Sequence, residues 1–366
     1  MKISDLILES AKASLALQRA DGSFPPGHNG PYDDLETSVR NTAHWVITLC
    51  KAYDLSGENI YKDAAWRAAQ YLLSTDARPM FATFFCRRNP EKDFSNGLIG
   101  QAWVIEALAL VSDTLGNPLY SDLAEQVFLM HPFDDKIGLW KRVNVDGSYS
   151  TFDMTFNHQL WFAATGLMIS DNVDDEVGRR IFMFLERVST HLLINRSGRI
   201  KHFVKPISYC RHILRSAFRF LTNPILTLTE NKNLRVKEIG YHAFNLYAFS
   251  LIKNMLPNHP IWQTQKISSV IRYLSRDEYI RGVENNYYSF QYNPIGIEVA
   301  FSILTFADPM EENVTRLAQE WIEKQLHYTF DLKSCLMQKN TNDPATLAAR
   351  VYELTRIPDL SMDISI

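Results

Sequence analysis

The sequence has 366 residues, of which 46% are hydrophobic and 12% aromatic, and its formal net charge is −3 at pH 7. This composition predicts a globular chain with a large core, and no run of about 18 apolar residues predicts a membrane span. The four cysteines lack CxxC spacing, so neither a metal site nor a disulfide framework is expected, and no cofactor is predicted. Because no RNA- or DNA-binding module is recognisable, nucleic acid is not expected as a partner.

The N-terminal segment and the pairs of helices that follow it set the predicted organisation. Residues 1–18 have a helical period that includes Asp5 and Glu9, which the apolar core of a secretory signal would not tolerate, so a cytoplasmic protein is expected. Beyond it, apolar helical stretches come in pairs separated by polar loops. The predicted pairs are 3–18 with 37–55, 58–74 with 96–115, 117–130 with 155–169, 174–194 with 238–256, 259–276 with 293–307, and 310–328 with 343–355.

The second helix of each pair is the more apolar one. NTAHWVITLCKAY, GQAWVIEALALV and NHQLWFAATGLMI are apolar nearly all round, which is typical of an inner helix, whereas the first helices keep a charged face. Repeated hairpins that cannot bury their faces alone must stack, and six of them can close into a ring. We therefore predict an all-α fold, a single (α/α)6 toroid over residues 1–366 with a basic insertion at about 196–237.

Three tryptophans mark the repeat. Trp45, Trp103 and Trp161 lie 58 residues apart each time, well inside three of the second helices. This placement predicts that they pack against neighbouring helices rather than serve as platforms for sugars.

Short motifs indicate a family. QRADGSF at 18–24, followed by helices with polar starts, resembles the six-hairpin glycosidase-like proteins, and the six-hairpin pattern covers the whole chain. GQAW at 100–103 is similar to the RGQAW helix start of unsaturated glucuronyl hydrolases, with Ile99 where those enzymes tend to carry Arg. DMTFN at 153–157 resembles the segment that holds their catalytic Asp, although the order of the two segments is reversed here. The resemblance implies a carbohydrate-active enzyme with an oligosaccharide or polysaccharide substrate, in bacterial polysaccharide metabolism.

In a closed ring, the loops that lead into the inner helices converge at one end of the central cavity. Polar residues at these starts are therefore candidates for a shared site, since sugars are bound by carboxylates, amides and aromatic faces. The catalytic candidates are Asp153, Asp34, His158, Tyr241 and His242. The substrate-binding candidates are Asp33, Arg40, Asn41, His44, Asn96, Gln101, Asn157, Gln159, Tyr288 and Gln291.

Two reactions and a binding role remain open at this point. Asp153 with a second carboxylate such as Asp34 would hydrolyse a glycosidic bond, and this is the preferred reaction for a uronate-containing glycan. Alternatively, Tyr241 and His242 would abstract a proton beside a carboxylate, as in lyases and epimerases, while Arg40 or Asn157 neutralises the uronate. A third reading is a glycan-binding scaffold without catalysis, in which Asp153 only caps its helix.

The insertion at 196–237 carries ten Lys or Arg residues and one acid, Glu230. It could be a lid over an acidic glycan, with Arg199, Lys201, Lys205, Arg211 and Arg215 as contacts, or a solvated insertion outside the ring. The cationic stretch 209–228 could also lie on a membrane surface. The sequence does not determine the oligomeric state.

Overall fold

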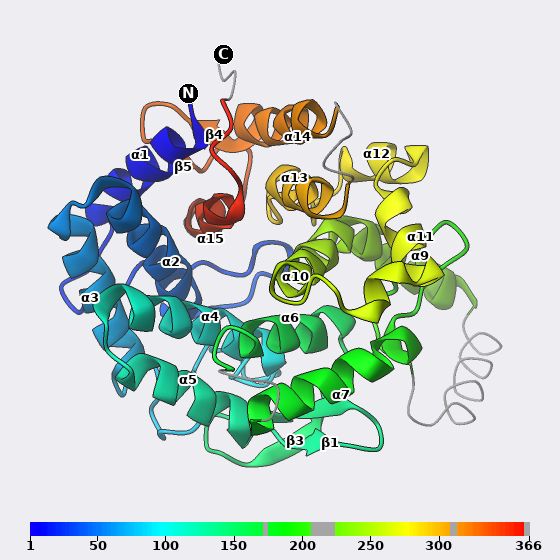
Figure 1. The fold of residues 1–366 in the computed structure, drawn as a ribbon, viewed down its shortest axis with the longest axis horizontal. Helices are drawn as coiled ribbons and strands as arrows, with labels where there is room; N and C mark the ends of the chain where they lie inside the picture. The colour runs from blue at the N-terminus through cyan, green and yellow to red at the C-terminus, as the bar shows by residue number, and fades with distance from the viewer. Residues whose placement is uncertain (171–174, 206–223, 308–312, 362–366) are drawn as a thin grey trace.

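The computed structural model describes residues 1–170, 175–205, 224–307 and 313–361, and its helices form a closed double ring (Figure 1). The inner helices are α2 (Val39–Ser56), α4 (Gly97–Leu115), α6 (Phe156–Gly166), α10 (His242–Met255), α13 (Ile295–Phe306) and α15 (Pro344–Ala349) with its 3-10 continuation η3 (Arg350–Arg356). The outer helices are α1 (Ile3–Leu15), α3 (Asn59–Leu73), α5 (Leu119–Met130), α7 (Glu176–His191), α11 (Gln265–Tyr273) with α12 (Asp277–Val283), and α14 (Val314–Thr329).

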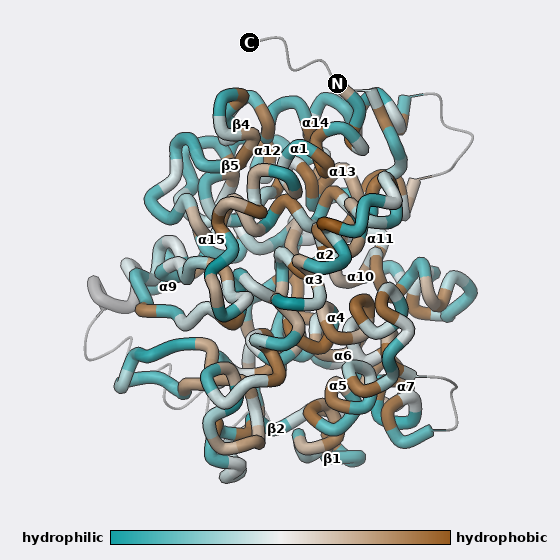
Figure 2. The backbone as a smooth tube through the Cα atoms, turned by 90° about the vertical axis from the view of Figure 1, so that its left-hand side faces the viewer, coloured by the Kyte–Doolittle hydropathy of each residue, from teal (hydrophilic) through white to brown (hydrophobic). Residues whose placement is uncertain are grey.

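Packing between successive inner helices closes the ring. α2 contacts α4, α4 contacts α6, α6 contacts α10, α10 contacts α13, and α13 contacts η3, which returns to α2. Apolar segments concentrate in the interior and hydrophilic segments towards the periphery (Figure 2). The predicted all-α toroid is therefore confirmed, because helices that are apolar on most sides need neighbours on both flanks.

Local signals explain where several helices stop. Gly57 and Gly116 end α2 and α4 with positive φ angles of 72° and 64°, a conformation that costs glycine no Cβ clash. Asp343 begins α15: its side chain accepts a hydrogen bond from the Thr346 amide, and Pro344 follows it at the first helical position.

Two small antiparallel sheets interrupt the helices, and the sequence analysis did not predict them. Strands β1 (Phe133–Asp134), β2 (Leu139–Val143) and β3 (Tyr149–Phe152) lie between α5 and α6, with Phe133 paired to Trp140 and Lys141 to Phe152. Strands β4 (Phe330–Asp331) and β5 (Leu336–Met337) lie between α14 and α15. These hairpins shape the loops that approach the inner helix starts.

No stretch of the sequence was expected to be long and apolar enough to cross a membrane, but helix α4 is. A window of 18 of its 19 residues has a mean hydropathy of 1.4. In the ring, 78% of its apolar window is buried, with α2 on one side and α6 on the other. This burial is typical of a core helix, which passes the same length test as a membrane span.

Further elements lie in the connections: the 3-10 turns η1 (Gly30–Tyr32) and η2 (Pro260–Gln263), and helix α9 (Pro224–Gly240), which leads into α10. Of the predicted insertion, the structure describes residues 196–205 and 224–237. Most of the stretch 209–228, including Arg211 and Arg215, lies outside the described residues.

Candidate active site

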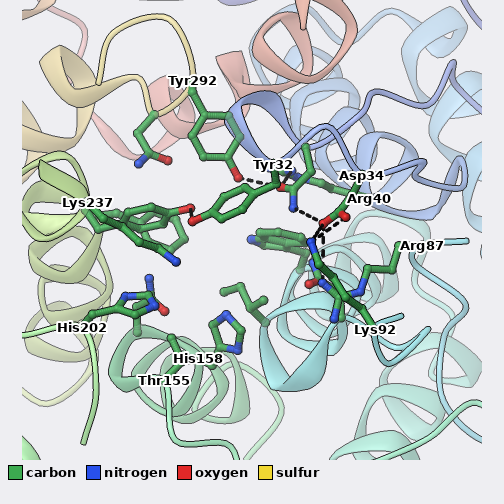
Figure 3. A pocket seen from close by; sticks show the side chains of 18 of the residues that line it. Tyr32, Asp34, Arg40, Arg87, Lys92, Thr155, His158, His202, Lys237 and Tyr292 are labelled. Atoms are coloured by element: carbon green, nitrogen blue, oxygen red, sulfur yellow. Dashed lines mark hydrogen bonds and ion pairs between the residues drawn. The ribbon is translucent and has the colours of Figure 1, made fainter. Parts of the chain in front are cut away.

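The starts of the inner helices meet at a cavity of about 220 Å³ (Figure 3). Its walls come from all six hairpins and from helix α9, so residues far apart in the sequence share one space. The lining residues are Asn29, Tyr32, Asp34, Arg40, Arg87, Lys92, Asn96, Ile99, Trp103, Thr155, Asn157, His158, His202, Lys237, Tyr241, Phe244, Tyr292, Asn293 and Arg350. The predicted candidates among them are Asp34, Arg40, Asn96, Asn157, His158 and Tyr241.

Asp153 lies behind His158 rather than on the cavity wall. Its carboxylate Oδ2 is 2.8 Å from His158 Nδ1 and accepts a hydrogen bond from the Leu98 amide at 3.1 Å, at the N-terminus of α4. The other oxygen accepts one from the Thr155 amide. Burial alone would raise the pKa of Asp153, but the His158 ring and these amides lower it to about 2. Asp153 is therefore an ionised group that orients His158.

Gly97 permits the close contact between the start of α4 and Asp153 in the next hairpin. A Cβ atom on Gly97 would lie 2.4 Å from the Asp153 carboxylate, and Gly97 has a φ of +59°. The first turn of α4 can approach Asp153 because this position carries no side chain. The positive end of the α4 dipole then adds to the stabilisation of the anion.

His202 is a second histidine of the cavity, and the sequence analysis did not name it. Its backbone is fixed because its carbonyl accepts from the Phe156 amide at 2.9 Å and its amide donates to Glu238 at 3.2 Å. No hydrogen bond to its ring is made by the described residues. Burial, followed by the charges of Lys237 and His158, holds the pKa of His202 well below 6.5. Its imidazole is therefore neutral at pH 7.

The cavity wall is strongly cationic. Five Lys or Arg side chains line it, at positions 40, 87, 92, 237 and 350, against one carboxylate, Asp34. Lys237, on α9, has no ion-pair partner among the described residues, and its Nζ lies 4.9 Å from the Tyr32 ring centroid. Burial, and then the nearby charge of Lys92, lowers the pKa of Lys237 to about 8. An unpaired, half-buried ammonium group calls for an anionic ligand.

Arg40 is held in place while part of its guanidinium remains unbonded. Its Nη1 donates to Asn29 at 3.0 Å and to Glu36 at 3.2 Å, and its guanidinium carbon lies 4.2 Å from the Trp103 ring centroid. Its Nε and Nη2 atoms are buried without a hydrogen-bond partner. Such orphaned donors are costly, so Arg40 is held in the wall by its remaining contacts at the expense of two hydrogen bonds.

Asp34, by contrast, is fully engaged. Its oxygens accept from Lys92 at 2.7 and 2.9 Å and from Asn89 at 2.8 Å, and Arg87 lies 3.8 Å away. Burial opposes ionisation, but the bonds from Lys92 and Asn89 outweigh it and lower the pKa of Asp34. The Asp34 carboxylate therefore holds Lys92 and Arg87 of the loop 87–92 in place, and it is not a free group that could act on a substrate.

Several predicted residues are buried outside the cavity. Both ring nitrogens of His242 are hydrogen-bonded: Nε2 donates to Val270 O at 3.0 Å, and Nδ1 accepts from the Ile200 amide at 3.3 Å. Burial lowers the pKa of His242 to about 3. His44 is stacked on Tyr352 at 4.4 Å. Asn41 donates to Pro25 O at 2.8 Å. The structure gives these three side chains packing roles, because none of them reaches the cavity.

The remaining candidates surround the cavity at a distance. Gln101 and Gln159 are fully buried and bond to loop backbones. Asp33 is exposed and lies 3.5 Å from His28, whereas Tyr288 packs against the rings of Tyr32 and Tyr241. Gln291 lines a second cavity, described below.

Three of the predicted lid contacts, Arg199, Lys201 and Lys205, lie among the described residues, and none of them lines the cavity. Arg199 forms ion pairs with Glu238 and Glu278, so its charge is neutralised within the protein. Lys201 and Lys205 are exposed and do not line the cavity. Among the described Lys and Arg residues of the predicted insertion, Lys237 at its end lines the cavity.

The tryptophans of the repeat are buried as predicted. Trp45 and Trp161 have 1% and 0% of their surface exposed, and Trp161 stacks on Phe244 with ring centroids 4.8 Å apart. Trp103 also packs, but one edge of it lines the cavity beneath Arg40.

The closed ring of helix pairs, with a polar cavity at the inner helix starts, defines a six-hairpin glycosidase-like protein. Solved structures of this class align over nearly the whole chain. Cellobiose 2-epimerase from Bacillus thermoamylovorans gives a TM-score of 0.66 at 12% identity, covering 97% of this chain and 98% of its own. A D-mannose isomerase gives 0.66 at 11% identity, with 97% of each chain covered, and a heparin-specific unsaturated glucuronyl hydrolase gives 0.59 at 11%, covering 97% of this chain and 95% of its own. These likenesses show the fold, which confirms the resemblance seen in the sequence.

A sequence relative specifies the family. No protein-family model matches the chain. The archaeal glycosylation protein Q of Haloferax volcanii is 41% identical over 366 residues, which cover 98% of both chains. The chain therefore belongs to the family of archaeal glycosylation protein Q. Among the residues that the structure describes, no group of three or more His, Cys, Asp or Glu side chains could hold a metal ion.

Proposed function

We propose that the protein is an isomerase or epimerase of a carboxylate-bearing sugar in a glycosylation pathway. The observation that carries this proposal is that His158, supported by Asp153, and the neutral His202 line one small cationic cavity. The glycosylation name of the relative and the carbohydrate-processing structural neighbours, an epimerase and an isomerase among them, support it.

Glycoside hydrolysis, the reaction preferred from the sequence, fits the cavity less well. It ordinarily needs two carboxyl groups beside the glycosidic bond, one of them protonated. Asp153 has its pKa lowered to about 2 and stands behind His158, so it cannot protonate a leaving group at neutral pH. Asp34 is also ionised, because Lys92 and Asn89 bind it.

Proton transfer at carbon suits the two histidines. When Nδ1 of His158 carries the ring proton and donates a hydrogen bond to Asp153, its Nε2 atom is unprotonated. Nε2 then takes a proton from the carbon next to a carbonyl group, and the Asp153 carboxylate stabilises the imidazolium that forms. The electron pair of the C–H bond forms a C=C bond, and the π electrons of the carbonyl group move to its oxygen, which gives an enediolate. His202, neutral because its pKa is depressed, donates an N–H hydrogen bond to that oxygen. His158 then returns the proton to the former carbonyl carbon, and the hydroxyl proton of the enediolate moves to the oxyanion, so that the neighbouring carbon becomes the new carbonyl group of the isomer. Return of the proton to the original carbon from its opposite face would instead give the epimer.

The cationic wall indicates an acidic substrate. Lys237 lacks an ion-pair partner among the described residues, so its ammonium group can bind a sugar carboxylate. Arg40 also lines the cavity and adds its positive charge to the wall. Their charges also stabilise an enediolate as it forms. The cavity volume of about 220 Å³ is below the range of about 300–1,000 Å³ that drug-sized ligands occupy, which favours a single sugar over a long glycan.

The test is deuterium exchange. The protein is incubated in D2O with a panel of free hexuronates, and NMR records deuterium at carbon together with any new isomer. We expect exchange that is lost in His158→Gln and retained in His327→Gln, a matched change of an exposed histidine on outer helix α14. An unsaturated product that absorbs near-ultraviolet light would identify a lyase instead, and saturable binding without exchange would identify a scaffold.

A further inference from the structure

A short strap between α1 and α2 forms part of the cavity wall. It comprises residues 28–34, and Asn29, Gly30 and Asp33 within it have φ angles of 60°, 53° and 47°. Left-handed conformations at asparagine and aspartate are uncommon and persist where surrounding contacts fix them. The strap therefore has one defined path along the cavity wall.

Contacts from other hairpins fix the strap. The Asp343 carboxylate accepts from the His28 amide at 3.0 Å and from the Gly30 amide at 2.9 Å. The Asn29 side-chain oxygen accepts from Tyr292 at 2.6 Å and from Arg40 at 3.0 Å. Asp343 and Tyr292 lie at the inner-helix starts of two other hairpins, and Arg40 lies on α2, the helix that follows the strap. The strap is therefore anchored at its beginning and along its centre.

This anchoring places the Tyr32 ring inside the cavity, between the side of Lys237 and the side of Arg40 (Figure 3). Its hydroxyl is 3.0 Å from that of Tyr241, which caps α10 in another hairpin, so the two side chains span the space between two parts of the ring. The ammonium groups of Lys237 and Lys92 lie 4.9 and 5.8 Å from its ring centroid. Cation–π attraction from both holds the ring in this position.

A second cavity of about 230 Å³ lies on the other side of the strap. Asn29 and Tyr32 line the reactive cavity, Gly30 and Pro31 line the second one, and Tyr292 lines both. The second cavity also contains the half-exposed ring of Tyr287 and the amides of Gln291 and Asn342. An aromatic face with amide groups is suited to a sugar unit, but the strap and Tyr32 separate that space from the histidines.

We propose that Tyr32 is a specificity-determining residue that limits the reactive cavity to one acidic sugar. The ring occupies the space through which a second, linked sugar would extend towards the second cavity. This inference rests on the proposed function and concerns the length of its substrate.

The experiment compares wild type with Tyr32→Phe and Tyr32→Ala. Calorimetry measures binding of glucuronate, galacturonate and mannuronate and of their 1→4-linked disaccharides. We expect wild type and Tyr32→Phe to bind a monosaccharide at least tenfold more tightly than its disaccharide, because both keep the ring that excludes the second sugar. In Tyr32→Ala this ratio should fall at least tenfold. Tyr32→Leu, which keeps an apolar side chain, should give an intermediate ratio and guards against a folding defect in the alanine variant.

The outcomes separate this inference from the proposed function. Equal ratios in wild type and Tyr32→Ala, or a wild type that binds disaccharides as well as monosaccharides, would overturn the role of Tyr32 and leave the acidic-sugar proposal intact. If the wild type bound none of the six ligands, both the role of Tyr32 and the acidic-sugar proposal would be overturned.

Discussion

Gln101 and Gln159 make the same three hydrogen bonds at equivalent places in two repeats. The Gln101 side chain accepts from the Phe84 amide at 2.8 Å and donates to Phe84 O at 3.2 Å and Ser95 O at 2.8 Å. The Gln159 side chain accepts from the Trp140 amide at 3.0 Å and donates to Trp140 O at 2.9 Å and Asp153 O at 2.8 Å. Each glutamine therefore joins the start of an inner helix to the loop before it.

Removal of such a bridge should destabilise the protein and displace the loop. Gln159→Ala leaves the buried Trp140 backbone and the Asp153 carbonyl without their partners, which should cost about 2–4 kcal/mol in the free energy of unfolding. Gln101→Ala should have a similar cost. Gln126→Ala, at an exposed position on α5, is the control and should lie within about 0.5 kcal/mol of wild type in urea unfolding. Equal midpoints for all three variants would show that these bridges do not stabilise the fold.

Asp153→Asn should suppress proton exchange without unfolding the protein. The neutral amide cannot stabilise a His158 imidazolium and can leave the ring in the wrong tautomer, so the exchange rate should fall about 10²- to 10⁴-fold. The measurement is deuterium incorporation into the accepted hexuronate, with circular dichroism to verify folding. Hydrolysis led by Asp153 predicts a different result, the loss of glycan cleavage in the same variant.

The fold could be predicted because its signals are local and repeated. Helices that are apolar on nearly all sides, alternating with helices that have one charged face, are compatible with few arrangements other than stacked hairpins. The predicted pair 58–74 with 96–115 corresponds to α3 (Asn59–Leu73) and α4 (Gly97–Leu115). Strands β1 to β3 were missed because they are short and belong to a loop whose composition indicates turns.

The site was only partly predictable. Asp34, Arg40, Asn157 and His158 line the cavity because they follow the repeat, in which inner helix starts converge. His202 and Lys237 belong to the insertion, where no repeat spacing indicates their position.

A single residue step separates a cavity residue from a core residue at the start of α10. Tyr241 lines the cavity, but the next residue, His242, points into the core. Successive side chains on a helix differ by about 100° in direction, so a pattern defined to within one residue cannot assign the face.

Lys237→Met should weaken binding of acidic sugars selectively. Loss of the ammonium group removes a charge-assisted contact worth about 1.5–3 kcal/mol, equivalent to an increase of about 10- to 100-fold in Kd for a hexuronate. Binding of the neutral sugar with an alcohol in place of the carboxyl group should change little. Lys232→Met removes an exposed lysine from the same helix, α9, and should leave both affinities unchanged. An equal loss for the acidic and the neutral sugar would contradict carboxylate recognition by Lys237.

The pH dependence of binding should follow the same lysine. Burial and the charge of Lys92 lower the pKa of Lys237 to about 8, so the ammonium form that attracts a carboxylate is present below pH 8 and is lost as pH rises through that value. Tyr32 and Tyr241, which face it, have pKa values raised well above 10 by burial and remain neutral over this range. Calorimetric Kd values for a hexuronate should therefore rise steadily from pH 7 to pH 9.5. Lys237→Arg keeps its charge throughout, so its Kd should stay nearly constant over the same interval. The same rise in both proteins would assign the titration to a group other than Lys237.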